Sequence, residues 1–297
     1  MDNVRCKICD SQDIVPNFSN DDRILKCKNC GIIFLSPALV MEKPGDYYSD
    51  RFVAEKYTNE STKRSLRDNS RVALALIKEF KPKGSLLDIG TNIGMFVDEA
   101  NKGGYKAMGI EPSRNLVIQA KQLAIPVISS TIEKFQPDTA FDIITMFHVL
   151  EHITEPLKAL GRIDSMQAAN GLLVLEVPNI ESYMAKKDGI SWKFIALEHL
   201  FYFSPKSISK FLDKAGYKIM KIKKRNFELN QLSIGKLLKY IAGARSDRNR
   251  FFVKNESGEK ILPVDRALLK KIARKLLLFL IKLLGREDHI LIIARKK

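Results

Sequence analysis

The sequence predicts an α/β fold, in which parallel strands are covered by helices, with a small cysteine module in front. Short apolar segments alternate with helical segments from about residue 58 onward, which is typical of parallel sheets. Residues 85–94, Ser-Leu-Leu-Asp-Ile-Gly-Thr-Asn-Ile-Gly, indicate a strand that ends in a tight turn into a helix. Four cysteines lie in two pairs before residue 31. With 297 residues and 45% hydrophobic content, we expect one large α/β domain with attachments.

The cysteine pairs are Cys6-Lys-Ile-Cys9 and Cys27-Lys-Asn-Cys30, separated by 17 residues. This spacing is typical of a zinc site in which each tight turn presents two thiolates. Four protein ligands leave no position for water, so the metal would be structural, in a zinc-ribbon module over residues 1–45. Two disulfides or unligated thiols are the alternatives. The N-terminus has no apolar signal region, which favours zinc and a cytoplasmic protein.

The segments after the module predict the body of the protein. Ser204-Pro205 marks the start of a late helix, because proline favours the first helical turn. The body comprises residues 46–227 and 288–297, with 228–287 as a helical insertion before the last strand. In chain order we expect helix 58–80, strand 85–89, helix 95–102, strand 106–110, helix 113–123, strands 125–128 and 141–147, a helix from about 155, strand 172–177, helix 204–216, strand 217–224 and a last strand 289–294.

The first two strands of the body end in acids, at the edge where parallel sheets bind ligands. Asp88 ends the first strand and can accept a hydrogen bond from a ligand amine or hydroxyl. Glu111 ends the second strand, where a ribose diol is usually held. Gly90 and Gly94 lack the Cβ atom that would block a ligand's approach to the backbone. Together these residues indicate a nucleoside-containing cofactor.

Several motifs in order carry a family resemblance. They are Leu-Asp-Ile-Gly at 87–90, Gly-Ile-Glu-Pro at 109–112, Phe-Asp-Ile-Ile at 141–144 and His-Val-Leu-Glu-His-Ile at 148–153. This order resembles class I methyltransferases that use S-adenosylmethionine (SAM). The resemblance implies a Rossmann-like seven-stranded sheet, with the last strand as the seventh. A nicotinamide-type domain would need G-x-G-x-x-G, which this chain does not supply.

The same resemblance implies a set of cofactor-binding residues. Asn92 stands where the family has its middle glycine, and asparagine tolerates the left-handed conformation better than most residues. The resemblance places Glu111 at the ribose hydroxyls, and Ile132 or Glu133 beside the adenine. The methionine and ribose part of SAM would contact the turn after the first strand, and two residues at the end of the fourth strand would lie beneath the cofactor. The turn residues are Asp88, Gly90, Asn92 and Gly94, and the two residues beneath the cofactor are Phe147 and His148.

Three of the four histidines fall where such an enzyme would bind its acceptor. His148 and His152 flank Glu151, and on a helical turn they would share a face. They could bind the substrate side of the site, cap the turn or pack under the cofactor. A metal site is not favoured there, because a third ligand is missing from the pattern. His289 starts the last strand and is interpreted as structural.

The segment Glu198-His199-Leu-Phe-Tyr202-Phe-Ser204 follows a loop that contains Trp192. It resembles the Glu-His-x-x-Tyr-x-Ser element of nucleotide-sugar C-methyltransferases, which also begin with a zinc-binding cysteine module, and a pattern in O-methyltransferases of envelope sugars. The resemblance implies that His199, paired with Glu198, is the base or a substrate ligand, with Tyr202 and His148 at the same site. Alternatively, His199 anchors the loop through a hydrogen bond.

The net charge of +16 is concentrated at the C-terminal end. Residues 1–217 hold 28 basic and 27 acidic side chains, whereas residues 218–297 hold 22 and 7. In residues 264–284 the cations fall on one half of a helical projection and the large apolar residues on the other. This pattern suits a helix lying on an anionic membrane surface, or one packed on the enzyme or on a second copy. It does not favour nucleic acid, because the cations alternate with leucine and isoleucine instead of aromatic residues.

We therefore expect a SAM-dependent methyltransferase with a structural Zn²⁺, acting on a sugar, as a nucleotide-sugar or lipid-linked glycan, in cell-envelope polysaccharide synthesis. It would be cytoplasmic, on the inner face of the membrane if the basic segment binds lipid. O-methylation of a small aromatic or quinone-type acceptor is the alternative. A catalytically inactive zinc-ribbon and basic-tail binding protein is an alternative of another class. The sequence does not define the oligomeric state.

Overall fold

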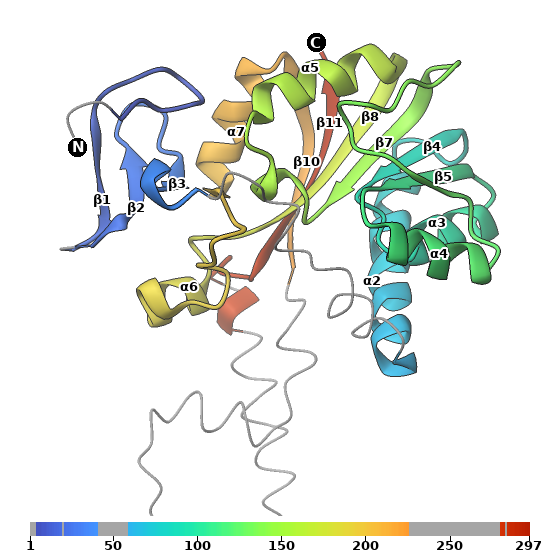
Figure 1. Cartoon of the computed structure of the whole chain (residues 1–297), viewed down its shortest axis with the longest axis horizontal. Coiled ribbons are helices and arrows are strands. Elements are labelled where there is room, and N and C mark those ends of the chain that lie inside the picture. The colour runs from blue at the N-terminus through green and yellow to red at the C-terminus, as the bar shows by residue number, and fades with distance from the viewer. Residues whose placement is uncertain (1–3, 20, 41–58, 226–279, 283) are drawn as a thin grey trace, which may run out of the picture.

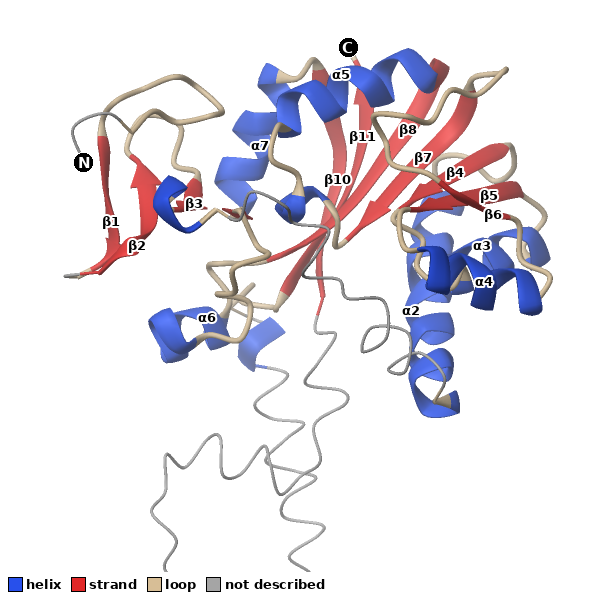
Figure 2. Ribbon diagram, in the orientation of Figure 1, coloured by secondary structure: helices blue, strands red, loops and turns tan. Residues whose placement is uncertain are grey.

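The computed structural model describes residues 4–19, 21–40, 59–225, 280–282 and 284–297. Within these ranges a central sheet is covered by helices, and a small second sheet lies at one side (Figures 1 and 2). The predicted α/β class is confirmed. Of the predicted insertion over 228–287, residues 228–279 and 283 lie outside the described part of the chain.

The central sheet has seven strands in the order β10-β11-β8-β7-β4-β5-β6. β11 is antiparallel to both of its neighbours, and the other adjacent pairs are parallel. The last strand of the chain is thus the seventh strand of a Rossmann-like sheet, as predicted. The strands are β4 (Ser85–Ile89), β5 (Lys106–Glu111), β6 (Val127–Ser129), β7 (Phe141–Phe147), β8 (Gln167–Pro178), β10 (Tyr217–Arg225) and β11 (His289–Lys296).

The strand order creates a crevice at the carboxyl ends of the central strands. From β4 the chain runs outward through β5 to β6, and then returns to β7 on the other side of β4. Ligands of open α/β sheets bind where the strand order reverses in this way. The ends of β4, β5 and β7 are therefore the part of the fold that positions a site.

Helices cover both faces of the sheet because the strands are apolar on both sides. One face packs against α2 (Glu60–Lys78), α3 (Met95–Lys102) and α4 (Arg114–Gln122). The other face packs against α5 (Pro156–Met166) and α7 (Pro205–Lys214), and its core continues into the cysteine module. The short elements are α6 (Tyr183–Asp188), η1 (Pro37–Leu39), η3 (Leu150–His152) and η4 (Gly189–Ser191).

The cysteine module forms a sheet of its own with a strand from far along the chain. Its order is β1 (Ile14–Phe18), β2 (Asp21–Cys27), β3 (Ile33–Leu35) and β9 (Phe201–Tyr202). β9 lies in the segment singled out around His199, which the sequence did not predict to be a strand. The module is thus joined to the body by backbone pairing as well as by side-chain packing.

Two strands differ from their predicted bounds for local reasons. The strand predicted at 125–128 is observed over Val127–Ser129. Pro126 has no backbone N–H to donate to a ladder, although its carbonyl oxygen accepts from Gly109 N at 2.9 Å. The strand predicted at 172–177 extends over Gln167–Pro178, and its pairing with β7 shifts register near Asn170, which has a positive φ of 61°.

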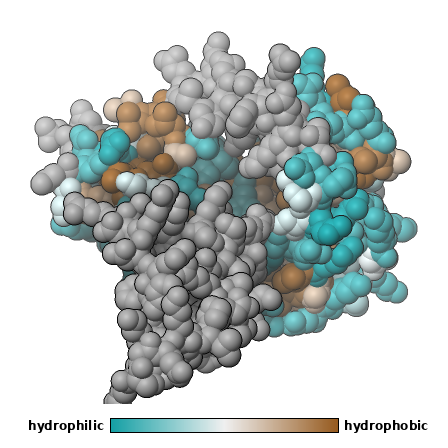
Figure 3. Space-filling model, turned by 90° about the horizontal axis from the view of Figure 1, so that it is seen from below, coloured by the Kyte–Doolittle hydropathy of each residue, from teal (hydrophilic) through white to brown (hydrophobic). Residues whose placement is uncertain are grey.

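The surface carries polar and apolar areas side by side. On the face seen from below, the described part is mostly hydrophilic, with hydrophobic atoms in separate patches (Figure 3). Among the described helices, none is both long and apolar enough to cross a bilayer. Residues 264–279 and 283 of the predicted amphipathic segment lie outside the described ranges.

Candidate active site

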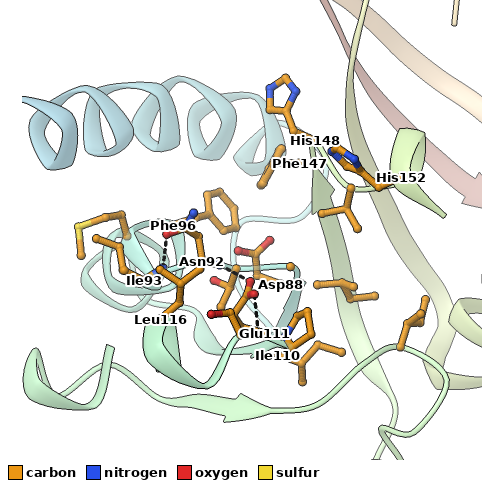
Figure 4. Close-up of a pocket in the computed structure, with 18 of the residues that line it drawn as sticks. Asp88, Asn92, Ile93, Phe96, Ile110, Glu111, Leu116, Phe147, His148 and His152 are labelled. Carbon is orange, nitrogen blue, oxygen red and sulfur yellow. Dashed lines mark hydrogen bonds between the residues drawn. The ribbon is translucent and has the colours of Figure 1, made fainter. Parts of the chain in front are cut away.

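A cavity of about 770 Å³ lies at the carboxyl ends of β4, β5 and β7. Its volume is in the range of ordinary cofactor and substrate pockets. Its lining includes α2 side chains and the loops after β4 and β7 (Figure 4). The predicted cofactor-binding residues that line it are Asp88, Gly90, Asn92, Glu111, Ile132, Glu133, Phe147 and His148. Gly94 is not among the described lining residues, because it sits at the start of α3.

The turn after β4 contains three left-handed residues. The φ angles of Gly90, Asn92 and Gly94 are 69°, 58° and 80°. A Cβ atom at Gly90 would lie 2.4 Å from Val149 Cγ2, and one at Gly94 would lie 2.6 Å from Ile125 Cγ2. From the sequence, the two glycines are expected to allow a ligand to approach the backbone. In the structure, protein side chains occupy the space that each missing Cβ leaves.

The carboxylate of Glu111 is oriented by two backbone donors. Its Oε2 accepts from Asn92 N at 2.9 Å, and its Oε1 accepts from Ser113 N at 3.0 Å. Burial raises the pKa of Glu111, and these two N–H groups oppose the rise. Asn92 is held in turn, because Ile93 N donates to its Oδ1 at 2.7 Å. The acid at the tip of β5 is therefore fixed in direction before any ligand arrives.

Asp88 lies deeper in the same part of the cavity (Figure 4). Thr145 Oγ1 on the neighbouring strand β7 donates to Asp88 Oδ1 at 2.6 Å. Burial raises the pKa of Asp88 to about 7, although hydrogen bonds from Thr145 and Thr91 oppose the rise. A cationic ligand group beside Asp88 would favour its ionised form.

An apolar wall borders the two acids. Ile132 is buried, whereas Glu133 beside it is exposed. The ring of Phe147 meets the ring of Phe96 edge to face, with centroids 4.7 Å apart. A flat apolar group could lie against this wall while its polar atoms reach the strand-end acids.

All four histidines of the chain gather at the other end of the site. His148 and His289 have ring centroids 4.8 Å apart, and His152 and His199 have centroids 4.6 Å apart. The ring of Phe194 stacks on His199 at 5.7 Å and meets His289 edge to face at 5.5 Å. From the sequence, His289 is expected to be structural, because no nearby residue in the sequence connects it with the other three histidines. The pairing of β11 with β8 brings it here.

Glu151 is the acid at the centre of this cluster. It is 1% exposed, and its Oε1 lies 3.5 Å from His148 Nδ1. Burial acts to raise the pKa of Glu151, but His148, His152 and His199 outweigh it, and the pKa is lowered. Burial likewise acts to lower the pKa of His148, but Glu151 outweighs it, and the pKa is raised. The cluster therefore holds an ionised carboxylate behind several imidazoles.

The expectation that His148 and His152 share a helical face is wrong. His148 has a φ of 56°, and the following turn, η3, is a 3-10 helix. The two side chains consequently point to different partners. His148 meets His289, whereas His152 meets His199.

His152 lines the cavity, and its ring is held by a hydrogen bond to the backbone of a distant segment. Its Nδ1 lies 2.8 Å from the carbonyl oxygen of Glu198. A carbonyl oxygen only accepts, so Nδ1 carries the proton, and in the neutral ring Nε2 is the acceptor atom. From the sequence, His199 is the stronger candidate for the base. The hydrogen bond between His152 and Glu198 joins distant segments, so the sequence pattern does not reveal it.

The residues of the Glu198–Tyr202 segment lie behind this histidine. His199 is 8% exposed, and burial lowers its pKa to about 4. The hydroxyl of Tyr202 donates to the carbonyl oxygen of Ala196 at 3.4 Å, and burial raises its pKa. Neither residue is among the described residues that line the cavity, and neither is Glu198. The segment supports the cavity wall in this structure.

The histidine cluster also supplies the third metal ligand that the sequence pattern lacked. Glu151, His152 and His199 each bring a donor atom within 4.8 Å of the others. Such a set can hold a proton or a divalent cation.

The four cysteines form a compact tetrad in the module. Cys6 Sγ lies 3.6 Å from Cys30 Sγ, and Cys9 Sγ lies 3.5 Å from Cys27 Sγ. These are distances between free thiols, and all four sulfurs lie within 4.8 Å of one another. Zn–S bonds of about 2.3 Å place the sulfurs of a tetrahedral site about 3.8 Å apart. The donors therefore fit the predicted zinc ion.

Comparison with known proteins gives the family. A family model described as a methyltransferase domain matches residues 59–222, more than half of the chain. A ubiquinone biosynthesis O-methyltransferase of Rhodopseudomonas palustris (strain HaA2) is 31% identical over 100 residues, which cover 32% of this chain and 40% of that protein. A protein of the same name from Bradyrhizobium sp. (strain ORS 278) is 30% identical over the same shares. The chain thus spans about 40% of the length of these relatives.

Solved structures show the same fold at low identity. A SAM-dependent methyltransferase from Archaeoglobus fulgidus has a TM-score of 0.52 at 21% identity, covering 82% of this chain and 97% of that one. A SAM-dependent methyltransferase from Thermotoga maritima has a TM-score of 0.51 at 18% identity, covering 84% and 100%. Together with the family match, the expected class of enzyme is confirmed. The chain belongs to the methyltransferase-domain family.

Proposed function

We propose that the cavity binds SAM across the ends of β4 and β5. The pre-oriented carboxylate of Glu111 supports a role in holding the ribose hydroxyls. Asp88 is buried, and a cationic group of the ligand would favour its ionised form, so we expect it to contact the methionine part of SAM. The apolar wall that includes Ile132 would take the adenine, with Phe147 and His148 towards the methyl group.

We propose that the acceptor is a ring hydroxyl, phenolic or quinol-type, bound at the histidine end of the cavity. The observation that carries this proposal is His152, a cavity-lining imidazole whose Nδ1 is tied to Glu198 while Glu151 lies behind it. Its Nε2 would take the hydroxyl proton as the oxygen bonds to the methyl carbon of SAM and the sulfur–methyl bond breaks, which releases S-adenosylhomocysteine. Glu151 would stabilise the imidazolium.

The acidity of the hydroxyl decides between acceptor classes. A phenol has a pKa of about 10, whereas water has one of about 15.7, and an aliphatic hydroxyl resembles water more closely. A single imidazole base deprotonates the more acidic phenol much more readily. The relatives named as ubiquinone biosynthesis O-methyltransferases support the same choice.

The sugar acceptor remains the second candidate. It is supported by the Glu198-His199-x-x-Tyr202-x-Ser204 element and by the cysteine module, both of which resemble sugar methyltransferases. In that mechanism His199, with Glu198, would act as the base, and the segment would have to turn towards the cavity.

Methyl transfer from labelled SAM tests both candidates. The full chain is incubated with a prenylated catechol in one assay and with a mixture of nucleotide-sugars in another. We expect label in the catechol. His152→Gln should lower turnover by about 100-fold or more while SAM affinity stays within about twofold, and exposed Lys158→Gln on α5 is the control. Label in the nucleotide-sugars alone, lost in His199→Gln and kept in His152→Gln, would overturn the ring-hydroxyl proposal.

A further inference from the structure

Among the described residues, a chain of backbone contacts links the cysteine module to the site. Strand β3 begins three residues after Cys30, and Cys27 N donates to the carbonyl oxygen of Ile32 at 2.9 Å. The second cysteine turn therefore runs directly into β3. A metal held by the four thiols would fix both ends of this turn.

Strand β3 in turn holds β9. Ile33 pairs with Tyr202 and Phe34 pairs with Phe201. Next to this pairing, Leu35 N donates to the carbonyl oxygen of Leu200 at 3.0 Å. β9 has only two residues and lies at the edge of the module's sheet, so much of its order depends on this neighbour.

The same segment holds the base proposed above. Leu200 N donates to the backbone carbonyl oxygen of Glu151 at 2.8 Å. Two residues earlier, the carbonyl oxygen of Glu198 accepts from His152 Nδ1 at 2.8 Å. The segment 198–200 is thus hydrogen-bonded to the turn that carries Glu151 and His152. The carbonyl oxygen of Leu200 in the same segment is hydrogen-bonded to the module.

Among the residues that the structure describes, the cofactor end of the cavity has no such connection. Described module residues do not line the cavity. Away from β9, the module contacts the body through Lys7, whose Nζ reaches Glu155 Oε1 at 3.1 Å, and Asn29, whose carbonyl oxygen accepts from Lys210 at 3.1 Å. Glu155 stands at the N-cap of α5 and Lys210 lies on α7, and both helices are on the opposite face of the sheet from α2, α3 and α4.

We propose that the metal-loaded cysteine module is a positioning element for His152: through β3 and β9 it holds the Glu198 carbonyl that selects the Nδ1–H form of the ring. This inference rests on the proposed role of His152 as the base. It gives the module a function at the acceptor end, separate from cofactor binding. Leu35 and Leu200 are positioning residues in this scheme, because they act through Glu198.

The ring state of His152 is measurable without turnover. The chain has four histidines, so nitrogen NMR of histidine-labelled full-length protein gives few signals, and His152→Gln assigns one of them. The zinc-loaded protein should show His152 protonated at Nδ1. After zinc is removed with a chelator, the signal should move towards the average of the two neutral forms. Amide exchange over 199–203 should become at least about tenfold faster.

Two proline substitutions distinguish loss of the β3–β9 contact from general disruption of the module. Leu35→Pro removes the donor to Leu200, whereas Ser36→Pro removes a bond within the module, to the carbonyl oxygen of Arg23. Ser36 already has a φ of −54°, which proline adopts. With zinc bound, Leu35→Pro should reproduce the chelator's effect on the His152 signal, and Ser36→Pro should not.

The affinity for S-adenosylhomocysteine, measured by calorimetry, should stay within about twofold in all of these samples, because the cofactor end is untouched. An unchanged His152 signal after zinc removal would overturn the proposal. So would an equal response in the two proline variants, or a cofactor affinity that falls with the loss of zinc. These readings do not depend on methyl transfer, so the positioning role and the proposed function can fail separately.

Discussion

His152 donates from Nδ1 to the backbone carbonyl oxygen of Glu198 over 2.8 Å, and this bond joins two distant segments at the cavity wall. One segment follows β7 of the methyltransferase sheet, and the other leads into β9, which pairs with the cysteine module. The bond leaves Nε2 as the acceptor atom of the neutral ring. It is therefore the contact through which the two parts of the protein would cooperate in catalysis.

Asp88→Asn should stabilise the cofactor-free protein at alkaline pH. Burial raises the folded-state pKa of Asp88 to about 7 from an ordinary value of 3.8. Between these values the folded state binds more protons than the unfolded state, so stability falls as pH rises, by up to about 1.4 kcal/mol per pH unit. The variant should gain on the order of 2–4 kcal/mol at pH 8 and little at pH 4, measured by urea unfolding.

Asp142→Asn is the control of opposite sign. Lys81 holds the pKa of Asp142 below its usual range. Its stabilisation is present above the unfolded-state pKa and is lost as pH falls through the folded-state value, so the substitution should destabilise the protein at pH 8. A loss of stability at pH 8 in both variants would show that Asp88 is ionised at little cost.

Gly94→Ala should cost more stability than Gly104→Ala. Both glycines have positive φ, 80° and 90°, so both substitutions strain the backbone by about 1–2 kcal/mol. A new Cβ at Gly94 would meet Ile125 Cγ2 at 2.6 Å, whereas one at Gly104 has nothing within 4 Å. We expect a further loss of about 1–3 kcal/mol at Gly94, read from urea midpoints. Equal losses would mean that Ile125 moves aside freely.

The basic segment should attach the protein to anionic vesicles. Each Lys or Arg near such a surface contributes about 1 kcal/mol, so replacing four cations with glutamine should remove about 4 kcal/mol and abolish co-sedimentation. The four are Lys270, Lys271, Arg274 and Lys275. Glutamine at four exposed lysines of the body, Lys102, Lys106, Lys121 and Lys134, serves as the control. Unchanged co-sedimentation of the first variant would show that these four cations do not bind the protein to the membrane.

The cavity lining at the ends of β4 and β5 could be predicted from sequence because its parts are local. Asp88 and Glu111 each end a short apolar strand, and parallel strands that follow one another bring their carboxyl ends together. The family resemblance of the ordered motifs implied the seven-stranded sheet, which the structure has. The packing of Gly94 was harder to predict, because its neighbour Ile125 lies in the loop before β6, far along the chain.

The histidine end could not be derived in the same way. The contacts of His152 with Glu198 and of His148 with His289 join segments that have no common periodicity. The positive φ of His148 also breaks the helical spacing on which the pattern His148-x-x-x-His152 was interpreted. Similarly, nothing in the C-x2-C spacing indicates that β3 pairs with a strand near residue 201.

Calorimetric titration of the full chain with S-adenosylhomocysteine tests whether the cavity beyond β4 and β5 holds SAM by its ribose at Glu111. One site per chain is predicted, with at least about tenfold weaker binding in Glu111→Gln, because charge-assisted hydrogen bonds contribute about 1.5–3 kcal/mol. Glu181→Gln, at an exposed position that is not among the residues lining the cavity, should change the affinity less than threefold, roughly 0.6 kcal/mol. Absence of binding by the wild type, or equal affinities in wild type and Glu111→Gln, would contradict this binding mode.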